Sequence, residues 1–151
     1  MTTATRQYTS NHARIRSRRS LVQAYYQWLM TKRPVGEIIT EFKTERVELK
    51  KADIDYFDRA MHGMVEHCAA IDAVLAPLLD RPGDELDPVE NAVLHLGSYE
   101  LMFLPEVPYR VVINEAVDLA KMFGAEQSHK YINGVLDRIA RKFRSAELNS
   151  R

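Results

Sequence analysis

Cysteine is nearly absent from this sequence: Cys68 is the only one among 151 residues. A single cysteine cannot form a disulfide within the chain, and this usage fits a reducing compartment. The sequence also lacks a run of about 18 apolar residues, which excludes a transmembrane helix, and its start lacks the apolar segment of a secretory signal. The start resembles a transit peptide in composition, but its arginines run directly into a helical pattern. We therefore expect a cytoplasmic protein that does not enter a membrane.

Acidic residues are absent from the first 36 positions. That stretch carries seven cations, whereas the other 115 residues carry 14 cations and 21 acids. A chain of zero net charge is therefore divided into a basic end of +7 and an acidic body of −7. Because a local cationic cluster attracts polyanions even at zero net charge, the basic end predicts a nucleic acid partner. The acidic body predicts a second partner that is itself basic.

Alternation of apolar and polar residues, which is typical of a half-buried strand, is missing, as are internal repeats and low-complexity tracts. Apolar residues recur at helical spacing instead. We predict helices over about 12–31, 35–43, 53–77, 88–104, 109–123 and 126–145. Residues 1–11 are expected to be flexible, and residues 12–151 to form one all-α domain, a compact bundle of about six or seven helices in two halves. The loop at 80–84 is expected to separate the halves.

Local signals mark the ends of several helices. Asp87 can accept hydrogen bonds from the free N–H groups of a helix start, and Pro88 suits the first helical position. Gly124 suits the end of the preceding helix. Gly97 lies within a helix that is apolar on most sides, which predicts a central helix and a close neighbour at the glycine.

The arginines of the first predicted helix form a candidate phosphate site. On a helical wheel, Arg14 and Arg18 fall on the same stripe as the apolar residues that follow them. Because an arginine is costly to bury, we expect the first turns to project beyond the core, with Arg16 and Arg19 on other sides of the helix. Guanidinium groups bind phosphate bidentately, so this end suits a nucleic acid. The alternative is a solvated basic segment without a ligand.

The start of the last predicted helix is a second candidate site. Tyr131 lies at the edge of the apolar stripe, and Lys130 points away from the core. An edge aromatic beside a cation can stack on a nucleobase and neutralise its phosphate. The alternative assigns Tyr131 to packing at the rim of the core.

Signals for catalysis or metal binding are weak. His62 and His67 are five residues apart instead of the four that a helical metal pair prefers, and Cys68 does not complete a tetrahedral set. His95 lies on a mostly apolar helix, which favours a packed or interface histidine over a catalytic base. The sequence contains no phosphate-binding glycine loop and no nucleophile elbow. We therefore expect neither an enzyme nor a bound metal or other cofactor.

Two adjacent segments carry a longer pattern. The sequences VPYRVVINEAVDLAK at 107–121 and FGAEQSHKYINGVLD at 123–137 resemble the signature of the NusB family of bacterial transcription antitermination factors. The sequences LVQAYYQW at 21–28 and DPVENAVL at 87–94 fit the same family, and the resemblance covers about residues 13–142. It implies an all-helical RNA-binding fold in two halves.

The resemblance also implies partners. Family members bind the boxA element of nascent ribosomal RNA leader transcripts together with NusE, a small-subunit ribosomal protein, and the pair joins an antitermination complex on RNA polymerase. Glu90 corresponds to a residue on the surface that faces NusE. RNA contacts of the family correspond to the arginine-rich start and to residues on the first and last helices, here Arg14, Arg16, Arg18, Tyr26, Lys130 and Tyr131. Arg19, an arginine of the same basic helix start, is a further candidate RNA contact.

At two positions the chain departs from the family pattern. The family commonly has an acidic residue where Gln127 stands, at the border of the RNA and NusE surfaces, and an arginine where His95 stands. Both departures bear on the strength of partner contacts. Two other functions stay open: the RNA-binding part of a ribosomal RNA methyltransferase, which needs a large cofactor-binding domain downstream, and a helical adaptor that binds only proteins.

Overall fold

The computed structural model describes residues 11–123 and 126–149 of the chain. Within these ranges lie eight α-helices and no strand, so the predicted all-α class is confirmed. The chain divides into two compact units, residues 1–63 and 64–151. The segment 1–11, expected to be flexible, lies outside the described residues apart from the backbone of Asn11. No helix in the described ranges has the length and apolar content needed to cross a membrane.

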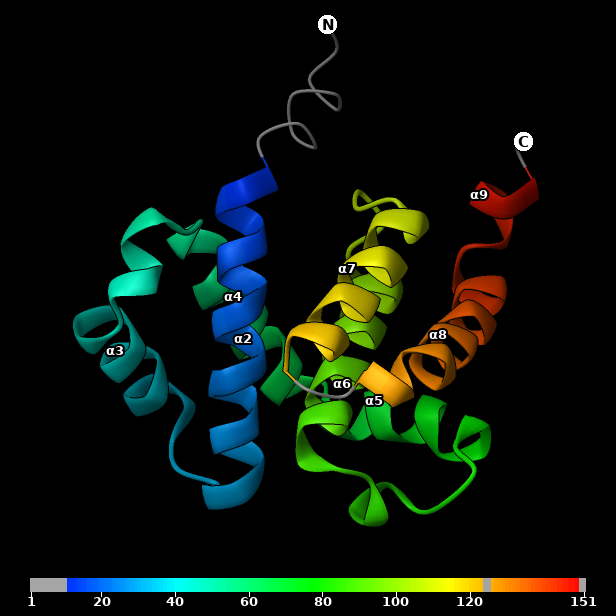
Figure 1. The fold of residues 1–151 in the computed structure, drawn as a ribbon, viewed down its shortest axis with the longest axis horizontal. Coiled ribbons are helices and arrows are strands. Elements are labelled where there is room, and N and C mark those ends of the chain that lie inside the picture. The colour runs from blue at the N-terminus through cyan, green and yellow to red at the C-terminus, as the bar shows by residue number, and fades with distance from the viewer. Residues whose placement is uncertain (1–10, 124–125, 150–151) are drawn as a thin grey trace, which may run out of the picture. The chain divides into compact units, whose positions relative to one another are not determined.

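The first unit is held together around α2. It contains α2 (Asn11–Thr31), α3 (Val35–Glu45), the 3-10 helix η1 (Val47–Lys51) and most of α4 (Ile54–Glu66) (Figure 1). α2 packs on α3 and η1. The rings of Phe42 and Phe57, with centroids 5.9 Å apart, join α3 to α4. The Ser17 hydroxyl donates to the Asp53 carbonyl oxygen at 2.6 Å, which fixes the start of α4 against α2.

The second unit is built around α6. It contains α5 (Cys68–Leu75), α6 (Pro88–Phe103), α7 (Tyr109–Met122), α8 (His129–Phe143), α9 (Ser145–Asn149) and the 3-10 turns η2 (Ala76–Leu78), η3 (Gly83–Glu85) and η4 (Glu126–Ser128). α6, α7 and α8 pack pairwise against one another, and α5 packs on α6 (Figure 1). α6 is buried from Ala92 to Leu101, so the predicted central helix is confirmed. The predicted cap is confirmed too, since Asp87 Oδ1 accepts the Val89 N–H at 2.8 Å.

Three predicted boundaries are wrong. The single helix expected over 53–77 is broken at His67, whose backbone (φ −98°, ψ 14°) leaves the helical region while its ring stacks on Phe103 at 4.1 Å. Because α5 then packs on α6, the units divide at 63/64 and not in the loop at 80–84. The last helix is preceded by η4 and ends at Phe143. At these points tertiary packing outweighs the local helical pattern. The cap expected at Gly124 lies outside the described residues.

The charge of the chain follows the division into units. Residues 1–63 contain 12 cationic and 7 acidic residues, a net charge of +5, and residues 64–151 contain 9 and 14, a net charge of −5. The contrast between a basic end and an acidic body is therefore a contrast between two structural units.

Gly97 allows α6 and α8 to approach each other. A methyl group at Gly97 would lie 2.8 and 3.0 Å from the terminal carbons of Leu136, which is itself fully buried. We expect Gly97→Val to lower the free energy of unfolding by roughly 1–3 kcal/mol, because the core must deform around the added carbons. Gly134→Ala on α8 is the matched control: nothing lies within 4 Å of its added methyl, so it should stabilise the helix by about 0.5–1 kcal/mol. Urea denaturation of both variants tests this, and equal stabilities would contradict it.

Candidate nucleic-acid interface

Arg14 is held in place at the start of α2. Its guanidinium carbon lies 4.0 Å from the centroid of the Tyr56 ring, and its Nη2 lies 3.3 Å from Asp53 Oδ2. These three residues line a pocket of about 310 Å³ together with Asp55 and Arg59. Asp53 also starts α4, since its Oδ1 accepts the Tyr56 N–H at 3.0 Å. A phosphate at Arg14 would therefore have to share this guanidinium with Asp53 or displace it.

Arg18 does not face solvent as the sequence predicts. Its side chain is only 2% exposed, and its guanidinium carbon lies 5.8 Å from the centroid of the Tyr56 ring. The neighbouring Ser17 and Ser20 are buried as well. Small serines allow close packing on this face of α2, and the negative face of an aromatic ring favours a cation beside it. The expectation that the first turns project beyond the core is wrong, and Arg18 is unavailable to phosphate in this arrangement.

Three other candidates on α2 remain accessible. Arg16 and Arg19 are half-buried, and Arg19 Nη1 lies 3.9 Å from Glu48 Oε1 on η1. Tyr26, further along the helix, is 36% exposed. The basic unit therefore offers Arg14, Arg16, Arg19 and Tyr26 as candidate RNA contacts.

Tyr131 and Lys130 lie in the first turn of α8. Lys130 is exposed, whereas Tyr131 is half-buried and its hydroxyl accepts the Asp80 N–H at 3.0 Å. Burial raises the pKa of the Tyr131 hydroxyl because it disfavours the charged phenolate. The guanidinium carbon of Arg81 lies 5.6 Å from the centroid of the Tyr131 ring. The ring is therefore neutral at physiological pH and held by the loop that carries Asp80 and Arg81.

An open pocket of about 460 Å³ adjoins this ring, lined by Lys130, Tyr131, Gly134 and Arg138 among others. Lys130, Gly134 and Arg138 follow one another at intervals of four residues, so they share a face of α8. The glycine keeps this face open, since nothing lies within 4 Å of a methyl group added there. One aromatic ring and two cations around an open pocket suit a nucleobase and its adjoining phosphates.

Two residues of this region are not among those predicted from the sequence. Arg138 lies eight residues after Lys130, a spacing that would have indicated it. Arg81 comes from the loop before α6, and only the fold brings it beside Tyr131.

Glu90, expected to face a protein partner, is largely covered. Its side chain is 12% exposed, and its Oε2 lies 3.8 Å from Arg81 Nη2. Its Oε1 accepts a hydrogen bond from the Ser128 hydroxyl at 2.6 Å. Glu90 therefore joins the first turn of α6 to the turn that precedes α8, and Arg81 contacts both Glu90 and Tyr131.

His95 and Gln127 have opposite surroundings. His95 is 1% exposed, and its Nε2 lies 2.8 Å from Asp72 Oδ1. The predicted contact between His95 and a protein partner is therefore wrong, because α6 is the central helix of its unit. Gln127 lies in η4 and is exposed, so it remains a candidate for partner contacts.

The fold and the candidate site define an all-helical protein with cationic and aromatic side chains suited to a nucleic acid. The chain belongs to the NusB family, whose family model matches residues 15–141. It is 43% identical over 141 residues to the transcription antitermination protein NusB of Nitrosococcus oceani, covering 93% of this chain and 94% of that protein. It is 50% identical over 127 residues to the NusB of Actinobacillus succinogenes, covering 84% of this chain and 89% of that protein.

Solved structures show the same relationship. The crystal structure of antitermination factors NusB and NusE in complex with dsRNA contains a chain that is similar with a TM-score of 0.77 and 29% sequence identity, over 87% of this chain and 98% of that chain. The family resemblance carried by segments 107–121 and 123–137 is therefore confirmed.

Proposed function

We propose that this chain is a transcription antitermination factor. It binds the boxA RNA of nascent ribosomal RNA transcripts together with NusE and joins the elongating RNA polymerase complex. The structural observation that carries the proposal is the open pocket at the start of α8, which Lys130, Tyr131 and Arg138 line together. The names of the relatives support it, as does the solved complex that contains NusE and dsRNA. Because such a factor acts on nascent transcripts, we assign it to the cytoplasm.

The two competing functions have less support. The chain covers 94% of the Nitrosococcus oceani protein, which is named as an antitermination protein and not as an enzyme. That name favours an antitermination factor over the RNA-binding part of a methyltransferase. An adaptor that binds only proteins leaves the aromatic and cationic lining of the α8 pocket without a role. Holding RNA requires no catalytic group, so we propose a binding function without catalysis.

In the proposed mechanism, Tyr131 stacks on a base while Lys130 and Arg138 neutralise neighbouring phosphates. The arginines of α2 add phosphate contacts from the basic unit. NusE contacts Gln127 and the exposed part of Glu90. Gln127 comes three residues before Lys130 in the chain, and Ser128 between them bonds to Glu90 at 2.6 Å. The proposed NusE contacts therefore lie close in sequence to the RNA pocket.

Titration with RNA tests the proposed function. A single-stranded RNA that contains boxA and a scrambled control of equal length are titrated into the full chain, with and without NusE. We expect the boxA RNA to bind more tightly than the control and the preference to grow when NusE is present. Equal affinities for both RNAs in both conditions would contradict the proposal.

The salt dependence of binding tests the arginines of α2. On single strands the logarithm of affinity should decrease with the logarithm of salt concentration by about 0.7 for each neutralised phosphate. Replacing Arg14 and Arg16 together by alanine should therefore make the slope shallower by about 1.4. Arg18→Met is the contrasting variant: because Arg18 is buried, it should lower stability and leave the slope unchanged. An unchanged slope in the double variant would move the phosphate contacts elsewhere.

Glu90→Gln tests the proposed NusE contact. Glutamine removes the charge but keeps an oxygen that can accept the Ser128 hydroxyl, so the turn before α8 should stay in place. We expect weaker binding to NusE, with a loss that shrinks as salt rises because charge attraction is screened. Binding to immobilised NusE is measured at several salt concentrations. If RNA binding by the isolated chain decreases instead, Glu90 belongs to the RNA surface.

A further inference from the structure

Sulfur, oxygen and nitrogen donors meet where α5 packs on α6. Cys68 and Asp72 lie four residues apart on α5, which puts both side chains on one face of that helix. His95 reaches them from α6. The His95 Nε2 lies 2.8 Å from Asp72 Oδ1, and the Cys68 Sγ lies 3.7 Å from Asp72 Oδ2. When one donor atom is taken from each of the three residues, all three atoms lie within 4.8 Å of one another.

We propose that Cys68, Asp72 and His95 form a binding site for a divalent transition metal, of which Zn²⁺ fits best. Thiolate, carboxylate and imidazole are the ligands that zinc uses, and tetrahedral zinc with its usual bond lengths separates them by about 3.4–3.6 Å. The observed distances of 2.8 Å from His95 to Asp72 and 3.7 Å from Cys68 to Asp72 lie on either side of these values. Asp72 can adjust without repacking the core because its side chain is 62% exposed.

The three proposed ligands differ in their exposure to solvent. His95 is buried, Cys68 is half-buried and Asp72 is exposed, so a metal ion would enter from the Asp72 side. The buried imidazole is fixed by the packing of α6, which supplies a rigid ligand. The two ligands on α5 complete the set, and a bound ion would join α5 to α6.

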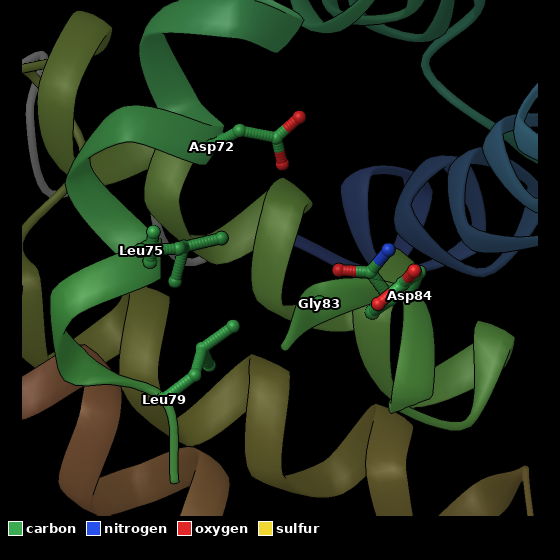
Figure 2. A pocket seen from close by; sticks show the side chains of 7 residues that line it. Asp72, Leu75, Leu79, Gly83 and Asp84 are labelled. Atoms are coloured by element: carbon green, nitrogen blue, oxygen red, sulfur yellow. The ribbon is translucent and has the colours of Figure 1, made fainter. Parts of the chain in front are cut away.

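The surroundings of Asp72 leave room for water as a further ligand. Asp72 projects from α5 at one end of a pocket of about 350 Å³ (Figure 2). Leu75 and Leu79 follow it along one wall, and Gly83 and Asp84 lie across from them (Figure 2). Three protein ligands with an open fourth position are within the range of coordination that zinc accepts.

The pair of His62 and Asp58 offers an internal comparison. These residues also lie four apart on one helix, with His62 Nε2 3.2 Å from Asp58 Oδ1. They lack a neighbouring thiol, and His62 is exposed. A metal that merely associates with surface histidine and carboxylate should not distinguish the two places.

Cobalt titration of the full chain tests the site, because tetrahedral Co²⁺ reports its ligands by absorption. We expect one Co²⁺ per chain, a thiolate-to-cobalt charge-transfer band, and displacement by Zn²⁺. Cys68→Ser should abolish the band. Cys68→Ser and Asp72→Asn should each weaken binding by more than the roughly 10- to 100-fold that loss of an outer-shell partner causes. His62→Gln, the matched control, should bind Co²⁺ like the unchanged chain.

Thermal unfolding with and without Zn²⁺ supplies a second readout. A metal that binds only the folded state raises the melting temperature, so Zn²⁺ should raise it in the unchanged chain and in His62→Gln but not in Asp72→Asn. Asp72 is exposed, so its variant tests the site without the folding defect that a change at buried His95 brings. No saturable binding of Co²⁺, or equal affinity and equal stabilisation in all the variants, would overturn the proposal.

Discussion

Replacing Arg144 by methionine should lower the free energy of unfolding by about 3–5 kcal/mol. The side chain is only 5% exposed. Its guanidinium donates hydrogen bonds to the carbonyl oxygens of Glu100 at 3.0 Å, Leu101 at 2.9 Å, Leu104 at 2.8 Å and Val107 at 2.8 Å. The last carbonyl groups of a helix lack hydrogen-bond donors within the helix. Arg144 supplies donors to the carbonyl oxygens at the end of α6 and in the turn after it. Methionine preserves much of the volume but removes the guanidinium donors from all four carbonyl oxygens. Glu100 and Leu104 keep the backbone N–H groups of Leu104 and Val107 as donors.

Two further variants separate this effect from a loss of positive charge. Arg144→Lys keeps the charge, but one ammonium group cannot serve acceptors in the directions that a planar guanidinium reaches, so an intermediate loss is expected. Arg141→Met, one turn earlier, removes an exposed arginine that lies 2.9 Å from Asp137, and its effect should stay within about 0.5 kcal/mol. Urea denaturation followed by circular dichroism ranks the three variants. Equal stability of Arg144→Met and Arg141→Met would show that the carbonyl contacts contribute little.

Arg144 also shows which parts of the fold the sequence can predict. The start of α6 is encoded locally, because Asp87 and Pro88 supply a cap and a fixed backbone angle within one turn. The end of α8 is not, because the acceptors of Arg144 lie 37 to 44 residues earlier in the chain. A helical pattern that continues to Ser145 gives no sign of the break.

The arginines of α2 illustrate a different limit. The helical wheel correctly puts Arg18 on the buried face, but the cost of burial led to the prediction that it faces solvent. That cost is offset by Tyr56 on α4, whose ring lies beside both Arg14 and Arg18. The pairing requires two helices separated by most of the first unit, so no local pattern reveals it.

The cysteine illustrates the same limit for chemistry. In the sequence, the histidines nearest to Cys68 are His67 and His62, so a sequence argument considers only these two as fellow metal ligands. The histidine that approaches Cys68 is His95, on the neighbouring α6. Lys130 and Tyr131, by contrast, are predictable as candidates, because an exposed cation beside an aromatic at the edge of an apolar stripe is visible within one helical turn.

Replacing Tyr131 by alanine should weaken RNA binding by roughly 5- to 150-fold, because stacking of one base is worth about 1–3 kcal/mol. The ring adjoins the open pocket, and Lys130 beside it can hold the adjoining phosphate. Tyr131→Phe keeps the ring and removes the hydroxyl that accepts the Asp80 N–H at 3.0 Å. That N–H is exposed and can bond to water instead, so the phenylalanine variant should bind RNA almost normally.

The rival role of Tyr131 is packing at the rim of the core, and Tyr131→Leu distinguishes the two. Leucine restores apolar packing but has no aromatic face. If stacking operates, the leucine variant should bind RNA as weakly as the alanine variant but have a higher melting temperature. If Tyr131 only packs, alanine should lower the melting temperature while its folded fraction binds RNA normally, and leucine should repair the stability. Affinity and melting temperature are measured on all three variants. Intact affinity in Tyr131→Ala, or equal damage by alanine and phenylalanine, would remove base stacking by Tyr131 from the mechanism.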